Sequence, residues 1–327
     1  MITKLSVSNF KSVRQLDIDC KKVNLFIGEP NTGKSNILES LALLSWWADP
    51  KQNLSDYVRC QQATQNLFYD GLLDHEIHVS LSLSSGKSEA GLHIRFVKDH
   101  FEVRVQPTSR DIAKVDYQGH LLSGIVIQPG VDVKFFRFQE RARHDGKDLG
   151  SLKPTNGTNL FSVVFGSEKL RETMKEFFQK YELRLVLKPQ ERLFEIQKQT
   201  DDLVFTLPYT LTSDTLRSII FYTVAIASNK DSVLVFEEPE SHAFPYYTKY
   251  LGERIALDQT NQFFIATHNP YLLSAIIEKT RKEDVQVFIT YFKNFQTRVK
   301  PLNTNQLSEL MEADPFFNLD RFIEAEE

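Results

Sequence analysis

Eight residues near the N-terminus, GEPNTGKS at 28–35, have the spacing of a phosphate-binding loop. They follow an apolar run at 23–27 that predicts a strand, and they precede helical apolar spacing that continues to about Trp47. Glycine lets the backbone curl around a phosphate so that several N–H groups point inward, and the helix N-terminus adds a partial positive charge. The predicted phosphate-contacting residues are Gly28, Asn31, Thr32, Gly33, Lys34, Ser35 and Asn36.

Within that loop, the lysine and the serine predict a nucleotide triphosphate with a metal ion. Lys34 would reach the β- and γ-phosphates of ATP, and the Ser35 hydroxyl would hold Mg²⁺. The alternative is a chance match in a glycine-containing turn. The flanking strand and helix favour the phosphate site, because a phosphate-binding loop needs both.

A second predicted strand, Ser232–Phe236, ends in two acids, Glu237 and Glu238. A continuous apolar run is typical of a strand buried on both faces, and open α/β sheets place ligands at the carboxyl ends of such strands. One acid there can hold Mg²⁺, and the next can orient or deprotonate an attacking water. A third strand, Gln262–Ala266, leads to His268, which can hydrogen-bond to a γ-phosphate. The alternative for the two acids is a solvated strand end.

The order of predicted elements indicates an α/β fold. Apolar residues alternate from His75 to Gln106, which predicts an antiparallel meander. Helices and strands alternate through the last third of the chain, which predicts a parallel sheet. We therefore expect an N-terminal lobe with the phosphate loop at 1–106, an inserted α+β middle region at 107–207 and a C-terminal lobe at 208–327.

Composition narrows the class of protein further. A chain of 327 residues with a net charge of −4 predicts one elaborated domain or two lobes and no global attraction to nucleic acid. Two cysteines are too few for a disulfide framework. The N-terminus has no apolar signal region, and no apolar run approaches the roughly 20 residues of a membrane span. We expect a cytoplasmic protein with no membrane partner.

The order of the motifs resembles a known family. The phosphate loop followed by EEPESHAFP at 237–245 and ATHNP at 266–270 looks like the ABC-type ATPase heads of the SMC–RecF branch, and more narrowly like stand-alone OLD-family ATPases of prokaryotic defence or toxin–antitoxin systems. LSVSNFKSV at 5–13 and LKPTNGTNLFSVV at 152–164 are similar to further segments of these proteins. The resemblance implies a P-loop NTPase fold of the ABC-head type and hydrolysis of ATP with Mg²⁺.

The resemblance also implies roles for single residues. Glu238 matches the catalytic glutamate, and His268 matches the switch histidine. Glu237 stands where the family usually has a metal-associated aspartate, and Lys11 matches a basic residue of the first hairpin that can touch phosphate. A glutamine-loop residue is expected after the first helix, with Gln62, Gln65 and Asn66 as candidates.

One family motif departs from its usual form. In the family, two heads pair head-to-tail, and a loop of the partner head completes each ATP site. This loop has the form L-S-x-G-x-x-R, which LTSDTLR at 211–217 matches best. Thr212 keeps the hydroxyl, whereas Asp214 replaces the glycine and would bring a negative charge toward the partner's γ-phosphate. The alternative is a helix cap, with Ser213 or Asp214 accepting the first free N–H groups. Both this change and Glu237 bear on the speed of hydrolysis more than on the binding of ATP, and whether they slow it stays open.

Three functions compete at this stage. The first is an ATPase that assembles as a homo-oligomer, a head-to-tail dimer or larger, and controls a separate effector such as a nuclease, as the resemblance to antiphage-defence proteins implies. The second is a nucleotide-gated scaffold with little turnover. The third is a RecF-like repair ATPase that binds DNA through a local basic stretch, whose residues are Arg137, Arg141, Arg143, Lys147 and Lys153, with Lys21 and Lys22 as another. Such runs are usually solvated faces.

Overall fold

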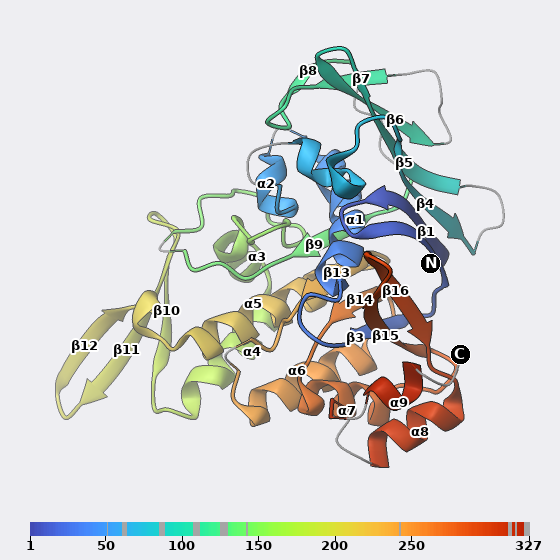
Figure 1. Cartoon of the computed structure of the whole chain (residues 1–327). Coiled ribbons are helices and arrows are strands. Elements are labelled where there is room, and N and C mark those ends of the chain that lie inside the picture. Colours follow the sequence, from blue (N-terminus) through green and yellow to red (C-terminus); the bar gives the residue numbers. More distant parts are fainter. Residues whose placement is uncertain are drawn as a thin grey trace.

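The computed structural model describes residues 1–50, 52–60, 64–84, 89–106, 112–124, 130–141, 143–241, 243–312, 316–317 and 319–323. Two large sheets lie on either side of one helix, α1 (Lys34–Ala48), and a smaller sheet projects from one end of the molecule (Figure 1). The helix α1 follows the phosphate loop directly, so its position decides where that loop opens.

The first large sheet has six strands in the order β16-β15-β3-β14-β13-β9. Its central strands are parallel and buried along their whole length, and only β16 is antiparallel. Strands buried on both faces require apolar side chains on both, which explains the continuous apolar runs. The strands are β3 (Val23–Ile27), β9 (Val133–Phe136), β13 (Val233–Glu237), β14 (Gln262–Ala266), β15 (Val285–Lys293) and β16 (Gln296–Pro301).

Helices cover both faces of this sheet. Phe26 of β3 belongs to the hydrophobic core on the side of α1, whereas its neighbours Leu25 and Ile27 belong to the core on the opposite side. That opposite core is closed by α5 (Asp214–Ser228), α6 (Pro245–Leu257) and α7 (Pro270–Lys279). The alternation follows from the two-residue period of a strand.

The second large sheet is antiparallel, with the strand order β2-β1-β4-β5-β6-β7-β8. One face carries buried apolar residues such as Val79, Leu92 and Val103, which share a core with α1, and the intervening residues form a polar outer face. The meander expected from His75 to Gln106 is therefore confirmed. The strands are β1 (Ile2–Phe10), β2 (Val13–Asp19), β4 (Ile77–Leu83), β5 (Glu89–Val97), β6 (His100–Gln106), β7 (Ile112–Val115) and β8 (Leu121–Ser123).

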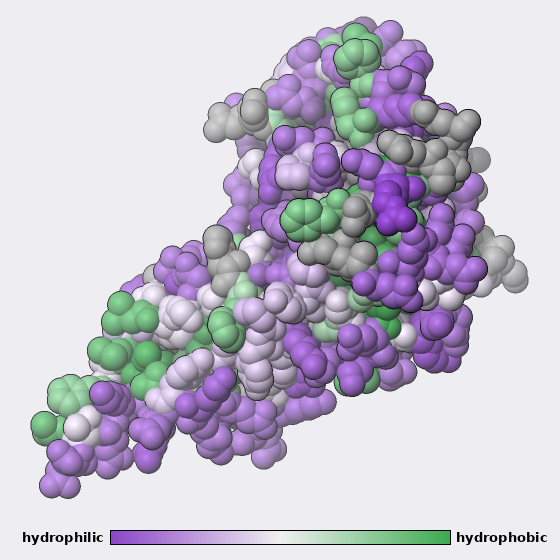
Figure 2. Space-filling model, turned by 60° about the horizontal axis from the view of Figure 1, so that its bottom comes forward, coloured by the Kyte–Doolittle hydropathy of each residue, from purple (hydrophilic) through white to green (hydrophobic). Residues whose placement is uncertain are grey.

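The third sheet joins β10 (Arg184–Lys188), β11 (Leu193–Thr200) and β12 (Leu203–Pro208). It follows the helices α3 (Leu160–Gly166) and α4 (Glu168–Gln179) and projects at the left of the molecule (Figure 1). Among the described strands β12 pairs only with β11, and its Leu203, Phe205 and Leu207 are exposed. Figure 2 shows hydrophobic side chains gathered over this projection.

Short elements complete the chain. They are the helices α2 (Leu54–Tyr57), α8 (Thr304–Glu312) and α9 (Leu319–Ile323) and the 3₁₀ turns η1 (Thr64–Leu67), η2 (Tyr69–Gly71) and η3 (Tyr209–Leu211). In the described part of the chain, no helix combines the length and apolar character needed to cross a bilayer.

The α/β fold class is confirmed, with a parallel sheet that joins the two ends of the chain. The boundaries at 106 and 207 stay a prediction. The strands of the expected inserted region 107–207 do not all form a separate unit. Its strands β7 and β8 extend the seven-stranded sheet, and β9 forms the edge of the six-stranded sheet beside β13. Only α3, α4 and β10–β12 form a part separate from both large sheets.

Candidate nucleotide site

The phosphate loop connects β3 to α1 and is held by close backbone approaches. Gly28 has φ +148° and Gly33 has φ +98°, values that favour glycine. A Cβ on Gly28 would lie 2.3 Å from the Thr290 carbonyl oxygen, and one on Gly33 would lie 1.9 Å from Thr297 Oγ1. Both glycines are therefore needed for the backbone to turn into α1 against β15 and β16.

The side chain of Lys34 lies inside the loop. The Lys34 ammonium is almost buried and donates to the carbonyl oxygens of Gly28 and Glu29, both at 2.7 Å. Burial lowers the pKa of Lys34, and the nearby Glu238 and Glu29 carboxylates oppose this shift. Lys34 is thus a desolvated cation inside an anion-binding loop, the arrangement that strengthens its attraction to phosphate.

A cavity of about 400 Å³ opens over the loop and α1. Its described lining includes Asn31, Gly33, Lys34, Ser35 and Asn36 of the predicted loop, the predicted Glu238 and His268, and also Ser12 and Arg59, but neither Gly28 nor Thr32. A second cavity of about 400 Å³ shares Ser35, Arg59 and Glu238 with it and extends past Glu237 to Arg137, Tyr222 and Ser241. Asn36 donates to Ser12 Oγ at 2.6 Å, which ties the helix start to the β1–β2 turn.

Glu237 lies at the end of β13 between two arginines. Arg137 donates to Glu237 Oε2 from Nε at 3.0 Å and from Nη2 at 2.5 Å, and Arg59 Nη2 lies 3.1 Å from Oε1. The Ser35 hydroxyl lines the same cavity as Glu237. Burial favours the neutral acid, but the two arginines and Ser35 together hold the pKa of Glu237 below its usual value, so it is an anion.

The serine hydroxyl and carboxylate fit a magnesium ion, which prefers hard oxygen ligands. Ser35 and Glu237 line the same cavity, so both can reach one ion there. Binding of the ion there requires the guanidinium groups of Arg59 and Arg137 to yield part of their contact with Glu237. Arg59 is free to do so, since its side chain is 62% exposed.

Glu238 follows with a backbone in the left-handed region, at φ +45°. Its N–H donates to the Ala266 carbonyl at 2.9 Å, which places it beside the end of β14. His268 Nδ1 lies 3.2 Å from Glu238 Oε1, and the Ser241 hydroxyl donates weakly to Oε2 at 3.4 Å. The predicted catalytic acid and switch histidine are therefore neighbours at one edge of the sheet.

Behind this pair lies a buried acid that the sequence analysis did not single out. Burial raises the pKa of Glu240 to about 7, although Thr267 donates a hydrogen bond to its Oε1. Its Oε2 has no hydrogen-bond partner among the described residues. Glu240 thus joins the turn after β13 to Thr267, the residue before His268.

A second buried acid, Glu39 of α1, holds together the basic residues around the site. Its side chain is 1% exposed and accepts a hydrogen bond from Lys11 Nζ, while Arg137 Nη2 lies 3.4 Å away. Lys11 also donates to the Arg59 carbonyl at 2.7 Å, and the Arg59 N–H donates to Glu39 at 3.3 Å. Lys11 is therefore tied to Glu39, and its predicted contact with phosphate stays a prediction.

Besides Glu240, three charged residues of the site were missed in the sequence: Glu39, Arg59 and Arg137. Arg137 was interpreted as part of a basic DNA-binding stretch, but it is mostly buried and ion-paired with Glu237 and Glu39, so that interpretation is wrong for this residue. A usable signal existed, because apolar residues recur along 131–138 as in a strand and Arg137 lies near its end, as Glu237 does in its own strand. Of the glutamine-loop candidates, Gln62 lies outside the described residues, and the described cavity lining includes neither Gln65 nor Asn66.

The signature-like segment at 211–217 ends beside the second cavity, whose lining includes the next residue, Ser218. The described lining of the two cavities includes neither Thr212 nor Asp214. Ser213 caps α5 by accepting the Leu216 N–H, which decides between the two capping candidates. The Asp214 carboxylate, 66% exposed, pairs with Arg217, whose guanidinium also donates to Glu140 at 2.6 Å.

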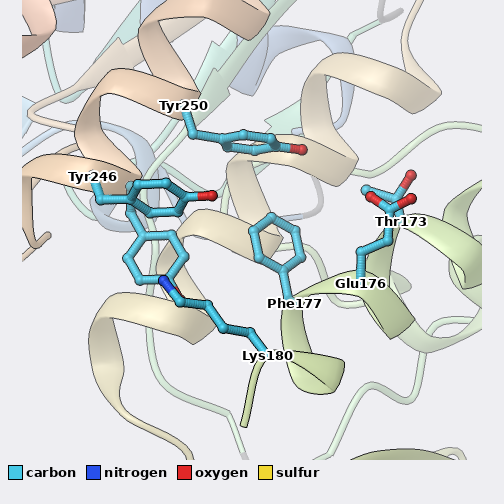
Figure 3. Close-up of a pocket in the computed structure, with 7 residues that line it drawn as sticks. Thr173, Glu176, Phe177, Lys180, Tyr246 and Tyr250 are labelled. Atoms are coloured by element: carbon cyan, nitrogen blue, oxygen red, sulfur yellow. The ribbon is translucent and has the colours of Figure 1, made fainter.

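A further small cavity, between α4 and α6, has a different character (Figure 3). The Lys180 ammonium lies 4.2 Å from the centroid of the Tyr246 ring, with Phe177 and Tyr250 beside it. This cation is already engaged with an aromatic face.

Comparisons with known proteins agree with this geometry. Residues 1–200 match the family model described as AAA ATPase domain. A structure of an SMC head bound to the C-winged helix domain of ScpA is similar to the chain at 13% identity and a TM-score of 0.55, covering 93% of this chain and 98% of that one. An SMC head domain from Thermotoga maritima gives 13% identity and a TM-score of 0.46, covering 93% and 99%. No curated protein matches the chain.

Proposed function

The chain belongs to the AAA ATPase domain family, and we propose that it binds Mg-ATP in the cavities over α1 and hydrolyses it slowly. The observation that carries the proposal is the convergence of Lys34, Ser35, Glu237 and Glu238 on one edge of the parallel sheet. Loop N–H groups and Lys34 would bind the phosphates, and Ser35 with Glu237 would hold Mg²⁺, which supplies charge stabilisation when bound. Glu238 would accept the proton of the attacking water, and His268 would hold Glu238 in place.

Replacing Lys34 by alanine tests the binding half of this proposal. We expect the affinity for Mg-ATP to fall by about 10- to 150-fold, because the variant loses charge-assisted contacts to the phosphates. Isothermal titration with ATP measures it. Lys175→Ala is the matched control, since Lys175 is an exposed lysine that pairs with Glu172 on α4. Equal affinity in wild type and Lys34→Ala would place the nucleotide elsewhere.

We propose further that two copies assemble head-to-tail around ATP. Two features support this proposal: Thr212 and Asp214 are absent from the described lining of their own chain's cavities, and their segment continues directly from the exposed apolar strand β12 through Leu211. Thr212 and Asp214 would then contact the partner's nucleotide. Control of a separate effector such as a nuclease, in OLD-like antiphage defence in the cytoplasm, extends the proposal on the sequence resemblance alone.

The Asp214 carboxylate favours a second candidate, a nucleotide-gated scaffold with little turnover. Pairing with Arg217 offsets part of its charge, so the remaining repulsion of phosphate is small. We expect Asp214→Asn to raise ATP turnover about two- to fivefold at limiting protein concentration, where head pairing limits the rate. A coupled phosphate-release assay across protein concentrations measures it.

The control is Glu168→Gln, which removes an acid from the first turn of another helix, α4. Turnover that is unchanged in Asp214→Asn would mean that this acid does not face the nucleotide. A wild type that binds ATP and pairs on binding it, but releases no phosphate, would favour the scaffold. For the alternative of RecF-like DNA binding, the exposed residues of the basic stretch remain available, whereas Arg137 is ion-paired with Glu237.

A further inference from the structure

The outer face of the seven-stranded sheet carries a cluster of metal-binding side chain types away from the nucleotide site. His78 on β4 and His93 on β5 are direct cross-strand partners, and Glu76 precedes β4 by one residue. Ile77 and Val79 point into the core shared with α1, so Glu76 and His78 point to the opposite face. The cluster therefore uses none of the residues assigned to ATP.

The three side chains are close enough to share one ion. One ligand atom from each of Glu76, His78 and His93 lies within 4.8 Å of the others. The two imidazole rings stand edge to face with centroids 4.3 Å apart, and His78 Nε2 lies 3.7 Å from Glu76 Oε2. A tetrahedral zinc ion with ligands at about 2.0–2.2 Å separates them by roughly 3.4 Å, which a small side-chain rotation reaches.

A second observation points to a ligand. His93 Nε2 is buried and has no hydrogen-bond partner among the described residues, which is a cost unless something binds it. Burial and the neighbouring His78 lower the pKa of His93. Glu76 and His78 are 35% and 41% exposed, which leaves an open side for entry and for a water ligand.

Neighbouring charges are nearly balanced. Arg95 lies 4.0 Å from Glu76, but its guanidinium donates to Glu102 at 2.8 Å and pairs with it at 2.7 Å. Arg104 also approaches Glu102, at 3.9 Å, and His100 Nε2 lies 3.8 Å from Glu102. Glu102 thus offsets much of the positive charge beside the cluster.

We propose that Glu76, His78 and His93 bind a first-row transition-metal dication such as Zn²⁺ on the outer face of the seven-stranded sheet. Two imidazoles and one carboxylate are ligands of zinc, whereas Mg²⁺ prefers oxygen ligands alone. The bound ion would clamp β4 to β5 through side chains. The proposal is independent of the proposed ATP chemistry.

Zinc titration of the metal-free full-length chain tests it, by calorimetry without nucleotide. We expect His78→Ala/His93→Ala to lose one bound equivalent of Zn²⁺, or at least about tenfold in its affinity. The matched control is His75→Ala/His120→Ala, which removes two histidines that each neighbour a single aspartate, and it should bind as wild type does. Zn²⁺ should also raise the melting temperature of wild type but not of the site variant.

Two results would overturn the proposal. One is equal zinc binding by wild type and the site variant; the other is binding that His268→Ala abolishes, which would assign the ion to the nucleotide site. If the double variant fails to fold, X-ray absorption of zinc-loaded wild type decides instead. Two imidazoles in the zinc coordination shell are expected, and a spectrum with none would refute the site.

Discussion

Replacing Glu238 by glutamine is expected to lower the rate of ATP hydrolysis by about 10²- to 10⁴-fold, which is the usual contribution of a general base to the rate of a reaction. Glutamine has nearly the same shape, so the backbone at φ +45° and the hydrogen bond to Ala266 should persist. Only the ability to accept a proton is lost. Single-turnover hydrolysis with saturating Mg-ATP measures this step apart from binding.

The same variant should keep its affinity for ATP within a few-fold, since Lys34 and the loop N–H groups are unchanged. If heads pair around ATP, uncleaved nucleotide should also make the paired form accumulate, visible by light scattering. The control is Glu278→Gln, an exposed acid on α7. Undiminished hydrolysis in Glu238→Gln would remove Glu238 from its proposed role and shift attention to the other acid at the strand end, Glu237.

The elements around the phosphate loop were predictable because their signals are local. A strand, a glycine-containing turn and a helix follow one another within 23–48. The acids at 237 and 238 and His268 were predictable for a related reason. Each follows an apolar strand, and the carboxyl ends of parallel strands share one edge of a sheet.

The contacts between charges were not predictable from local signals. Arg137 and Glu237 are 100 residues apart, and Arg137 and Glu39 are 98 apart. A basic residue after an apolar run looks the same in the sequence whether it faces solvent or a buried acid. Strand order decides between the two, because β9 pairs with β13 and brings Arg137 beside Glu237. The short elements after β15 were missed for lack of a long periodic pattern.

Breaking the basic–acidic network at Glu39 is expected to cost more stability than any surface substitution. In Glu39→Gln, Lys11 and Arg137 stay largely buried while one of their counter-charges is removed. Removing one partner of a buried ion pair typically lowers the free energy of unfolding by about 3–5 kcal/mol. We expect about 3 kcal/mol here, because Arg137 keeps Glu237 as a partner. Urea unfolding without nucleotide measures it.

Glu172→Gln provides the control, because it breaks the exposed pair with Lys175 on α4, and such pairs are worth about 0–1 kcal/mol. A double variant with Lys11→Met should recover part of the loss, since it removes the cation that Glu39→Gln leaves unpaired. A loss as small as the control's would mean that the cations turn to solvent. Glu39 would then stabilise neither the fold nor the positions of Arg59 and Arg137, and the two arginines would depend on Glu237 alone.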